Sequence, residues 1–296
     1  MEINTNLIKE LRERTGAGIV DCKKALIEAN GDMEAAVDWL RKKGLSAVAK
    51  KSSRVTAEGL VAVNVDGAVG VVLEVNSETD FVAKNEKFQN FVKNLSKIAI
   101  KAEDGNVEKL KEAAYESHTV NDELNSLIAT IGENLTIRRF KAVKGDKLFS
   151  YVHNTVSEGL GKIGVIVAFK NEGTPENIGR QIAMHIASTQ PLSLSKESLD
   201  PAEVAREKEV QKAKALEEGK PADIVEKMLA GRIEKFYQEV CLLEQQFIMD
   251  TDKKVSQLLK ENNATITDFA FYVLGAGIEK VHTDFASEVV KIVKGE

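Results

Sequence analysis

Cysteine is scarce in this sequence of 296 residues, which contains only Cys22 and Cys241. The two lie far apart and form no CxxC pair, which excludes a disulfide-stapled miniprotein. We expect two free thiols in a reducing compartment, the cytoplasm. Cys22 stands beside Lys23 and Lys24, an arrangement that can lower a thiol pKa. A plain position on a helix is the alternative interpretation.

Long apolar runs are absent as well. No run approaches the ~20 residues that a membrane-spanning helix needs. Residues 1–6 (MEINTN) contain no basic region followed by an apolar stretch. We therefore expect neither a membrane span nor a signal peptide.

The chain also lacks an excess of positive charge. It holds 41 Lys or Arg against 46 Asp or Glu, a net charge of −5. Neutralisation of phosphates by basic side chains supplies most non-specific affinity for nucleic acid, so this composition argues against a nucleic-acid coat. Basic residues do gather in residues 41–54 (RKKGLSAVAKKSSR). A solvated face is the first interpretation of this stretch, and contact with RNA or an acidic protein is the alternative.

Proline is missing from the first 174 residues, and all four prolines lie between positions 175 and 221. The organisation of the chain therefore changes in that region. The hydrophobic share of 43% and the charged share of 29% are those of an ordinary folded protein. A length of 296 residues predicts two or three domains.

The N-terminal region has helical periodicity. Residues 5–43 predict three short helices, with a break at residues 15–18 (TGAG) and Asp32 as the N-cap of the third. Gly44 is the predicted end of that third helix. Residues 46–54 then form a linker or a helical spacer.

The central region has the periodicity of strands. Residues 59–65 and 70–76 predict a hairpin around Asp66-Gly67, followed by a helix that carries Phe88, Phe91 and Leu95. A similar order returns in strands at 149–153 and 164–169 and a helix from Ile178, which suggests an internal duplication. Between the two copies, residues 105–132 are predicted to be helical and 135–140 to be a strand.

The C-terminal third begins with a predicted helical hairpin. Asp200-Pro201 is an N-cap followed by proline at the first helical position, and Pro221 starts a second helix with an apolar stripe from Val225 to Val240. The stripe is read as the core of the hairpin, with a partner contact as the alternative. A helix at 255–262, a strand at 267–273 and a last helix at 283–293 complete the prediction.

Catalytic motifs are weak throughout. Residues 159–164 (GLGKIG) match GxGxxG, but a dinucleotide fingerprint must follow a strand and open a helix, whereas this segment leads into a predicted strand. A loop inside a hairpin is the better interpretation. His118, His153, His185 and His282 form no HExxH motif or Cys/His cluster, so we expect no zinc site. His185 is read as a partly buried residue of a helix.

Asp80-Phe81 is the most unusual pair in the sequence, because a large aromatic residue stands beside a carboxylate directly after a strand. One interpretation is a helix start, with Thr79 as N-cap and Phe81 in the core. The other is an exposed functional pair.

Two long segments resemble one known family. Residues 11–26 (LRERTGAGIVDCKKAL) resemble the N-terminal signature of the bacterial elongation factor Ts family, and residues 74–84 (EVNSETDFVAK) resemble its second signature. Residues 131–134 (IGEN) followed by Arg138-Arg139 fit a third segment, and the order holds to residues 279–281. The resemblance covers essentially the whole chain.

The resemblance implies an α+β fold with three parts. These are a small three-helix, ubiquitin-associated-like N-terminal domain, a duplicated hairpin-plus-helix core and an inserted antiparallel coiled-coil hairpin. The implied boundaries are 1–45 for the N-terminal domain, 46–58 for a linker, 59–140 and 141–199 for the two core halves, 200–243 for the coiled-coil hairpin, and 244–296 for the rest of the second half with a C-terminal module.

The resemblance also implies a function. Members of this family are guanine nucleotide exchange factors, not enzymes, and need no cofactor or metal of their own. They bind elongation factor Tu, GDP-bound or nucleotide-free, and promote GDP release during translation elongation by disturbing its Mg²⁺ and phosphate site. We expect a cytoplasmic protein without a membrane or direct nucleic-acid partner. One-to-one and two-to-two complexes both stay open.

The family's working residues carry over to positions in this sequence. Those that displace the partner's Mg²⁺ fall on Thr79, Asp80, Phe81 and Val82. The resemblance places further partner contacts on Arg12, Ile19, Val20, His153, Ile248 and Met249. The family often has methionine at the positions of Ile19 and Val20, so only an apolar contact is implied there.

Overall fold

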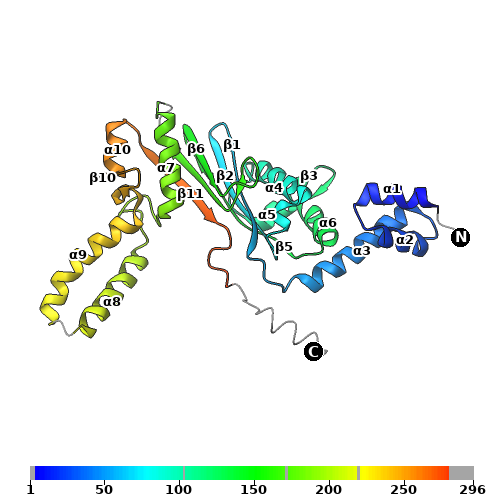
Figure 1. Ribbon diagram of the computed structural model, residues 1–296, viewed down its shortest axis with the longest axis horizontal. Helices are drawn as coiled ribbons and strands as arrows, with labels where there is room; N and C mark the ends of the chain where they lie inside the picture. The colour runs from blue at the N-terminus through cyan, green and yellow to red at the C-terminus, as the bar shows by residue number, and fades with distance from the viewer. Residues whose placement is uncertain (1–3, 103, 171–172, 219–220, 280–296) are drawn as a thin grey trace.

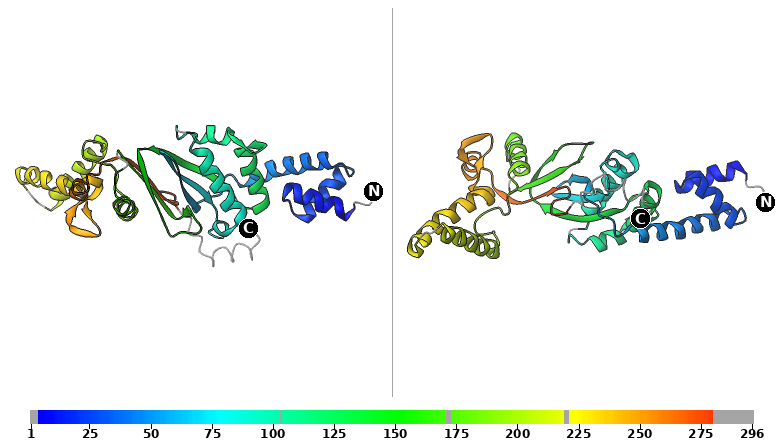
Figure 2. Two further views of the ribbon diagram at one scale, coloured as in Figure 1. Left: turned by 90° about the horizontal axis from the view of Figure 1, so that it is seen from above. Right: turned by 60° about the horizontal axis from the view of Figure 1, so that its bottom comes forward.

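A computed structural model describes residues 4–102, 104–170, 173–218 and 221–279. Over these residues the chain has an elongated shape, with helices at both ends of a central region of antiparallel strands (Figure 1). Figure 2 shows the same arrangement from two further directions. The mixed α+β class predicted from the sequence is confirmed. The helix predicted at 283–293 lies outside the described residues.

Three helices form the N-terminal end: α1 (Thr5–Thr15), α2 (Ile19–Glu28) and α3 (Met33–Lys51). They enclose a small core of their own, made of Leu11, Cys22, Ala25, Leu26 and Ala36. Asp32 caps α3 as predicted, because its Oδ1 accepts a hydrogen bond of 2.8 Å from the backbone N–H of Ala35.

The prediction that the third helix ends at Gly44 is wrong, because α3 continues to Lys51. The reason is a distant contact. α3 packs against α6 (Val120–Ile131), and a Cβ atom at Gly44 would lie 3.4 Å from the Cβ of Ala129, so Gly44 lies within this contact. Val48 then packs against the main core. Most of the segment 46–54 is therefore a helical spacer, which reaches from the N-terminal helices to the central region (Figure 1).

The first sheet has the order β5-β2-β1-β7. Its strands are β1 (Glu58–Asp66), β2 (Val69–Ser77), β5 (Leu135–Lys144) and β7 (Leu160–Gly161). One face packs against α4 (Glu86–Ala99) and α6, with α5 (Val107–Glu112) beside them. The prediction of continuous helix over 105–132 is partly wrong, because β3 (Ala114–Tyr115) and β4 (His118–Thr119) form a short hairpin between α5 and α6.

The second sheet has the order β11-β8-β6. Its strands are β6 (Lys147–His153), β8 (Ile163–Phe169) and β11 (Ile266–Val273), and α7 (Glu176–Thr189) packs on it. Six elements lie between α7 and β11: α8 (Pro201–Glu217), α9 (Ala222–Val240), η2 (Leu242–Glu244), β9 (Gln246–Phe247), β10 (Asp250–Lys254) and α10 (Val255–Glu261). The antiparallel pair of α8 and α9 forms the end of the molecule opposite α1 (Figure 1).

The two sheets face each other across a third apolar cluster. Val61, Val72 and Val143 from the first sheet meet Ile166, Ala168 and Ala270 from the second. The alternate residues of the same strands point away, toward α4 on one side and α7 on the other. The centre of the molecule therefore has four layers, helix, sheet, sheet and helix, with the central strands β2 and β8 buried on both faces.

The glycine-rich segment 159–164 belongs to this packing. Leu160-Gly161 is strand β7 and pairs with β1, and the chain then enters β8 in the other sheet. A Cβ atom at Gly164 would lie 2.6 Å from Val63 Cγ2, so the glycine is needed where the sheets approach. The segment opens a strand, which is not the arrangement of a dinucleotide fingerprint. It is also more than the hairpin loop that we predicted, because it joins the two sheets.

Gly179 tests the packing of the second half. A Cβ atom there would overlap the ring of Phe149, so we expect Gly179→Ala to lower the free energy of unfolding by about 1–3 kcal/mol through overpacking. Gly231 in α9 is the matched control, since no atom lies within 4 Å of its added Cβ. Gly231→Ala should raise stability by about 0.5–1 kcal/mol. Urea denaturation measures the free energy of unfolding of both variants. Equal values for Gly179→Ala and Gly231→Ala would contradict this account of the packing.

Candidate functional site

The segment between β2 and α4 presents a large aromatic residue to solvent. Phe81 is 76% exposed, and Asp80 beside it is exposed as well. Within the described parts of the chain, the Asp80 carboxylate makes no hydrogen bond or ion pair. The interpretation of Phe81 as a core residue is therefore wrong. We call Thr79, Asp80, Phe81 and Val82 the exposed turn.

The backbone of the exposed turn is nevertheless ordered. The 3₁₀ helix η1 (Val82–Lys84) begins at its last residue, and the carbonyl oxygens of Asp80 and Phe81 accept hydrogen bonds from the backbone N–H groups of Ala83 and Lys84 at 3.2 and 3.1 Å. Val82 is only 4% exposed and anchors this end of the turn in the core.

The helix start lies further along the chain than predicted. Asn85, and not Thr79, is the N-cap of α4, because its Oδ1 accepts hydrogen bonds from the backbone N–H groups of Lys87 and Phe88. Thr79 instead binds Glu133, in the turn between α6 and β5. Its backbone N–H and its hydroxyl donate to the two carboxylate oxygens at 2.9 and 2.6 Å.

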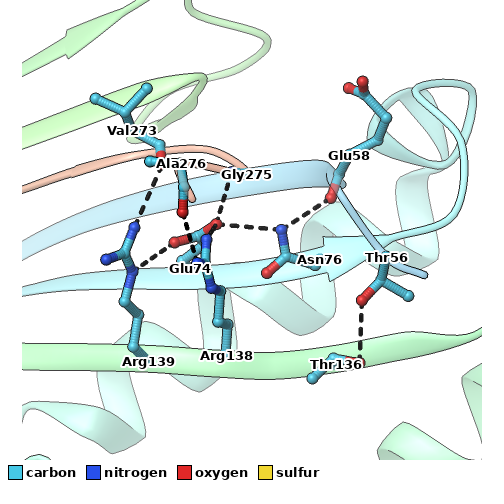
Figure 3. A network of polar contacts seen from close by, with 10 residues as sticks. All are labelled: Thr56, Glu58, Glu74, Asn76, Thr136, Arg138, Arg139, Val273, Gly275 and Ala276. Atoms are coloured by element: carbon cyan, nitrogen blue, oxygen red, sulfur yellow. Dashed lines mark hydrogen bonds and ion pairs between the residues drawn. The ribbon is translucent and has the colours of Figure 1, made fainter. Parts of the chain in front are cut away.

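The strand that leads to the exposed turn contains a buried charge. Glu74 in β2 is fully buried, and Figure 3 shows its carboxylate between two guanidinium groups. Arg138 Nη1 lies 2.9 Å from Glu74 Oε1 and Arg139 Nε lies 2.6 Å from Oε2. Asn76 Nδ2 and the backbone N–H of Gly275 also donate to Oε1, at 3.1 and 2.8 Å.

These donors keep the Glu74 carboxyl ionised. Burial raises its pKa, but the N–H of Gly275 and the two guanidinium groups outweigh burial, so the pKa lies below the ordinary value. Arg138 also donates to the carbonyl oxygen of Ala276 at 2.6 Å. The cluster therefore ties β2 and β5 to the segment that follows β11, 201 residues beyond Glu74 and 138 residues beyond Arg138.

The N-terminal contacts suggested by the resemblance lie on α1 and α2. Ile19 and Val20 are 56% and 79% exposed at the start of α2, and Arg12 is exposed near the end of α1. Arg12 also lines a cleft of about 670 Å³ between α1 and the helices α4 and α6.

The remaining contacts lie on the second half of the chain. Ile248 and Met249, between β9 and β10, are 40% and 44% exposed, and His153 is exposed at the end of β6. The backbone N–H of Ile248 donates at 3.3 Å to Nδ1 of His185, which is fully and not partly buried. Because α1 and β10 lie toward opposite ends of the molecule (Figure 1), the structure does not gather the predicted contacts into one pocket.

The structure offers no sign of a metal or thiol site among the residues it describes. No group of three or more His, Cys, Asp or Glu side chains there is placed to hold a metal ion. Cys22 and Cys241 are buried, and burial raises the pKa of both thiols. The hypothesis of a lowered pKa at Cys22 is therefore wrong. Among the same residues, no helix is both long and apolar enough to cross a membrane.

The basic stretch 41–54 is partly neutralised by carboxylates. Arg41 pairs with Asp122 at 3.0 Å, Lys43 with Asp21 at 2.5 Å, and Arg54 with Glu78 at 3.4 Å. These pairs favour the interpretation as a solvated face over a continuous surface for RNA phosphates.

Known proteins resemble this chain over essentially its whole length. A family model described as "Elongation factor TS" matches residues 78–276. The elongation factor Ts of Paracoccus denitrificans is 52% identical over 296 residues, and that of Ruegeria sp. is 52% identical over 295 residues, with 100% of both chains covered in each case. The elongation factor Ts of Rhizobium etli is 48% identical over 307 residues, with 99% of both chains covered.

The Glu74 cluster predicts a pH-dependent stability. Replacing the carboxylate by an amide leaves two guanidinium groups facing a neutral side chain, so Glu74→Gln should lower the free energy of unfolding by about 2–3 kcal/mol at pH 7. Because the native pKa lies below the ordinary value of 4.5, this stabilisation is complete above about pH 4.5 and is lost as the pH falls through the native pKa. The difference between wild type and variant should therefore shrink in acid.

Urea denaturation at neutral and acidic pH measures this difference. Glu261→Gln is the control, because its ion pair with Lys253, at 2.8 Å, lies on the surface and should contribute little at any pH. A Glu74→Gln variant that matches wild type at pH 7 would contradict the role assigned to the cluster.

Proposed function

The chain belongs to the elongation factor Ts family, the nucleotide exchange factors of elongation factor Tu in translation elongation, and from that premise we propose that the exposed turn is its working part. The observation that carries the proposal is the 76% exposure of Phe81 on an ordered backbone. As an exchange factor the protein is not an enzyme. It makes and breaks no covalent bond, and it acts through contact with its partner, elongation factor Tu.

Phe81 acts as a wedge between helices of the partner's nucleotide-binding domain. Burying a phenylalanine side chain contributes about 1.5–3 kcal/mol, which stabilises a partner conformation that is otherwise less favourable. Because the backbone of the turn is already hydrogen-bonded, little of this energy is spent on ordering the loop.

Asp80 acts on the magnesium site of the partner. Mg²⁺ demands near-octahedral oxygen ligation, so a small displacement of its ligands weakens its binding and that of the phosphates that share it. A carboxylate without a partner among the described residues of this chain is available for such a contact.

Thermodynamic linkage limits what the factor does. If this protein lowers the affinity of elongation factor Tu for GDP by a given ratio, bound GDP lowers the affinity of elongation factor Tu for this protein by the same ratio. The protein therefore accelerates exchange without choosing the nucleotide that enters. The outcome depends on the supply of nucleotides and on what captures the loaded partner.

The other exposed contacts extend the interface beyond the exposed turn. Ile19 and Val20 supply an apolar contact at one end, with Arg12 beside them, and Ile248 and Met249 supply a second contact near the other end. His153 provides a third contact at the end of β6. A long protein that holds its partner at several places retains it while the turn distorts the nucleotide site. Sedimentation of the complex distinguishes one-to-one from two-to-two assembly.

We further infer that the core is duplicated. The strand order β5-β2-β1 of the first sheet is repeated as β11-β8-β6 in the second, and a helix follows the middle strand in both. The pair of α8 and α9 is inserted in the second copy as a coiled-coil hairpin, and the three N-terminal helices form a ubiquitin-associated-like domain.

The family's task in translation also supports the cytoplasm as the location of this protein.

Phe81→Ala tests the proposal directly. Losing the apolar wedge should slow the release of GDP from elongation factor Tu by roughly 10- to 100-fold, which corresponds to the burial energy given above. Stopped-flow release of fluorescent GDP at increasing factor concentration measures this, and excess Mg²⁺ should blunt the acceleration by wild type.

Val65→Ala is the matched control for this substitution. Val65 is also an exposed apolar residue, 38% exposed, but it pairs with Gly70 at the other end of the β1–β2 hairpin from the exposed turn. We expect the exchange rate of Val65→Ala to equal that of wild type. A folded Phe81→Ala variant that releases GDP at the wild-type rate would refute the role of the exposed turn.

A further inference from the structure

We propose that Glu133 is a positioning residue for exchange, which holds Thr79 so that Asp80 and Phe81 meet the partner already ordered. This inference rests on the proposed function of the exposed turn. It concerns a side chain that lies outside the turn, on another part of the chain, and that acts only through Thr79.

The contact between the two residues uses every donor of Thr79. Its N–H donates to Glu133 Oε2 at 2.9 Å and its hydroxyl donates to Oε1 at 2.6 Å. The hydroxyl of Ser77 donates to the carbonyl oxygen of Thr79 at 2.8 Å. Hydrogen bonds to a carboxylate are among the stronger ones in proteins, so the residue before Asp80 is held on three sides.

A second contact reinforces the first. The carboxylate of Glu78 accepts a hydrogen bond of 2.5 Å from the backbone N–H of Asn134, the residue after Glu133. The consecutive residues Glu133 and Asn134 therefore hold the consecutive residues Thr79 and Glu78. The ladder between β2 and β5 ends at the pair Ser77 and Leu135, and these side-chain contacts continue it beyond the last strand pair.

The position of Glu133 is set by the end of α6. The helix ends at Gly132, whose φ of +89° turns the chain back toward β5. Glu133 is thus presented to the exposed turn from a fixed backbone, which is the arrangement that supports a functional side chain from outside.

The exposed turn is therefore anchored on both sides of Asp80 and Phe81. Thr79 is held by Glu133 on one side, and on the other Val82, the first residue of η1, is buried in the core. Without Glu133 the anchor on one side is weakened to the contacts of Ser77 and Glu78, and part of the binding energy of Phe81 must go into ordering the turn. We expect the loss to affect GDP release more than assembly, since the other contacts still hold the partner.

Stopped-flow release of fluorescent GDP from elongation factor Tu separates these effects. Glu133→Ala should lower the maximal release rate at saturating factor about tenfold, with a much smaller change in the half-saturating concentration. Glu133→Gln should recover most of the rate, because its amide oxygen still accepts the N–H of Thr79. Glu123→Ala is the matched control, since Glu123 lies on α6, the helix that precedes Glu133, pairs with His118 and does not touch the turn.

Thr79→Val supplies an independent route to the same contact, because it removes the hydroxyl and keeps the backbone N–H. If Glu133 acts through Thr79, the double variant Glu133→Ala with Thr79→Val should be no slower than Glu133→Ala alone. Additive losses in the double variant would overturn the proposal.

The outcomes distinguish this inference from the proposed function. If Phe81→Ala slows release but Glu133→Ala, still folded by circular dichroism, releases GDP at the wild-type rate, the positioning role is refuted and the function of the turn stands. If Phe81→Ala itself exchanges normally, the proposed function fails. If Glu133→Ala unfolds while Glu133→Gln and Thr79→Val exchange at the wild-type rate, Glu133 is a purely structural residue and the proposal is overturned.

Discussion

The buried carboxylate of Glu74 is the constraint on which the central part of the molecule depends. A charge without exposed surface is tolerated only when donors surround it, and these come from Arg138 and Arg139 of β5 and from Gly275 beyond β11. The donors arrive together only when both sheets are assembled. The first sheet alone brings Arg138, Arg139 and Asn76 to the carboxylate, and assembly with the second half adds the N–H of Gly275, so the complete cluster favours the assembled arrangement of the two halves. The same carboxylate fixes the strand that ends three residues later, at Ser77.

The exposed turn inherits its rigidity from that strand. β2 is paired on both sides, with β1 and β5, as far as Ser77, and the contacts of Glu78 and Glu133 extend the order by two residues. Phe81, which is exposed to solvent, follows directly after these ordered residues. An exchange factor must change the conformation of its partner and keep its own. Any binding energy that is used to order the exchange factor is not available to change the partner. A stiff sheet with a short exposed turn meets this requirement.

Local signals in the sequence predicted those elements whose ends are set by nearby residues. Asp32 caps α3 and Asp200 caps α8, as expected from residues within four positions, and the turn after Asp66 joins two strands. The failures have distant causes. Gly44 does not end α3, because α3 packs against α6 and places Val48 on the main core, and Thr79 does not cap a helix, because its partner is Glu133, 54 residues away. Propensity and capping rules contain no information on such contacts.

From the residues alone the Asp80-Phe81 pair stood out but its role stayed open, and only family resemblance assigned it one; the reason lies in what an exchange factor does. Its chemistry takes place on the partner's ion and phosphates, so its own sequence needs no metal cluster, activated thiol or acid–base pair. Exposed apolar residues do not identify the site either, because Leu192 and Ile27, at 58% and 54%, are as exposed as Ile19. What distinguishes Phe81 is exposure combined with a backbone held on both sides. That combination depends on hydrogen bonds between segments far apart in the sequence, and it becomes visible only once the chain is folded.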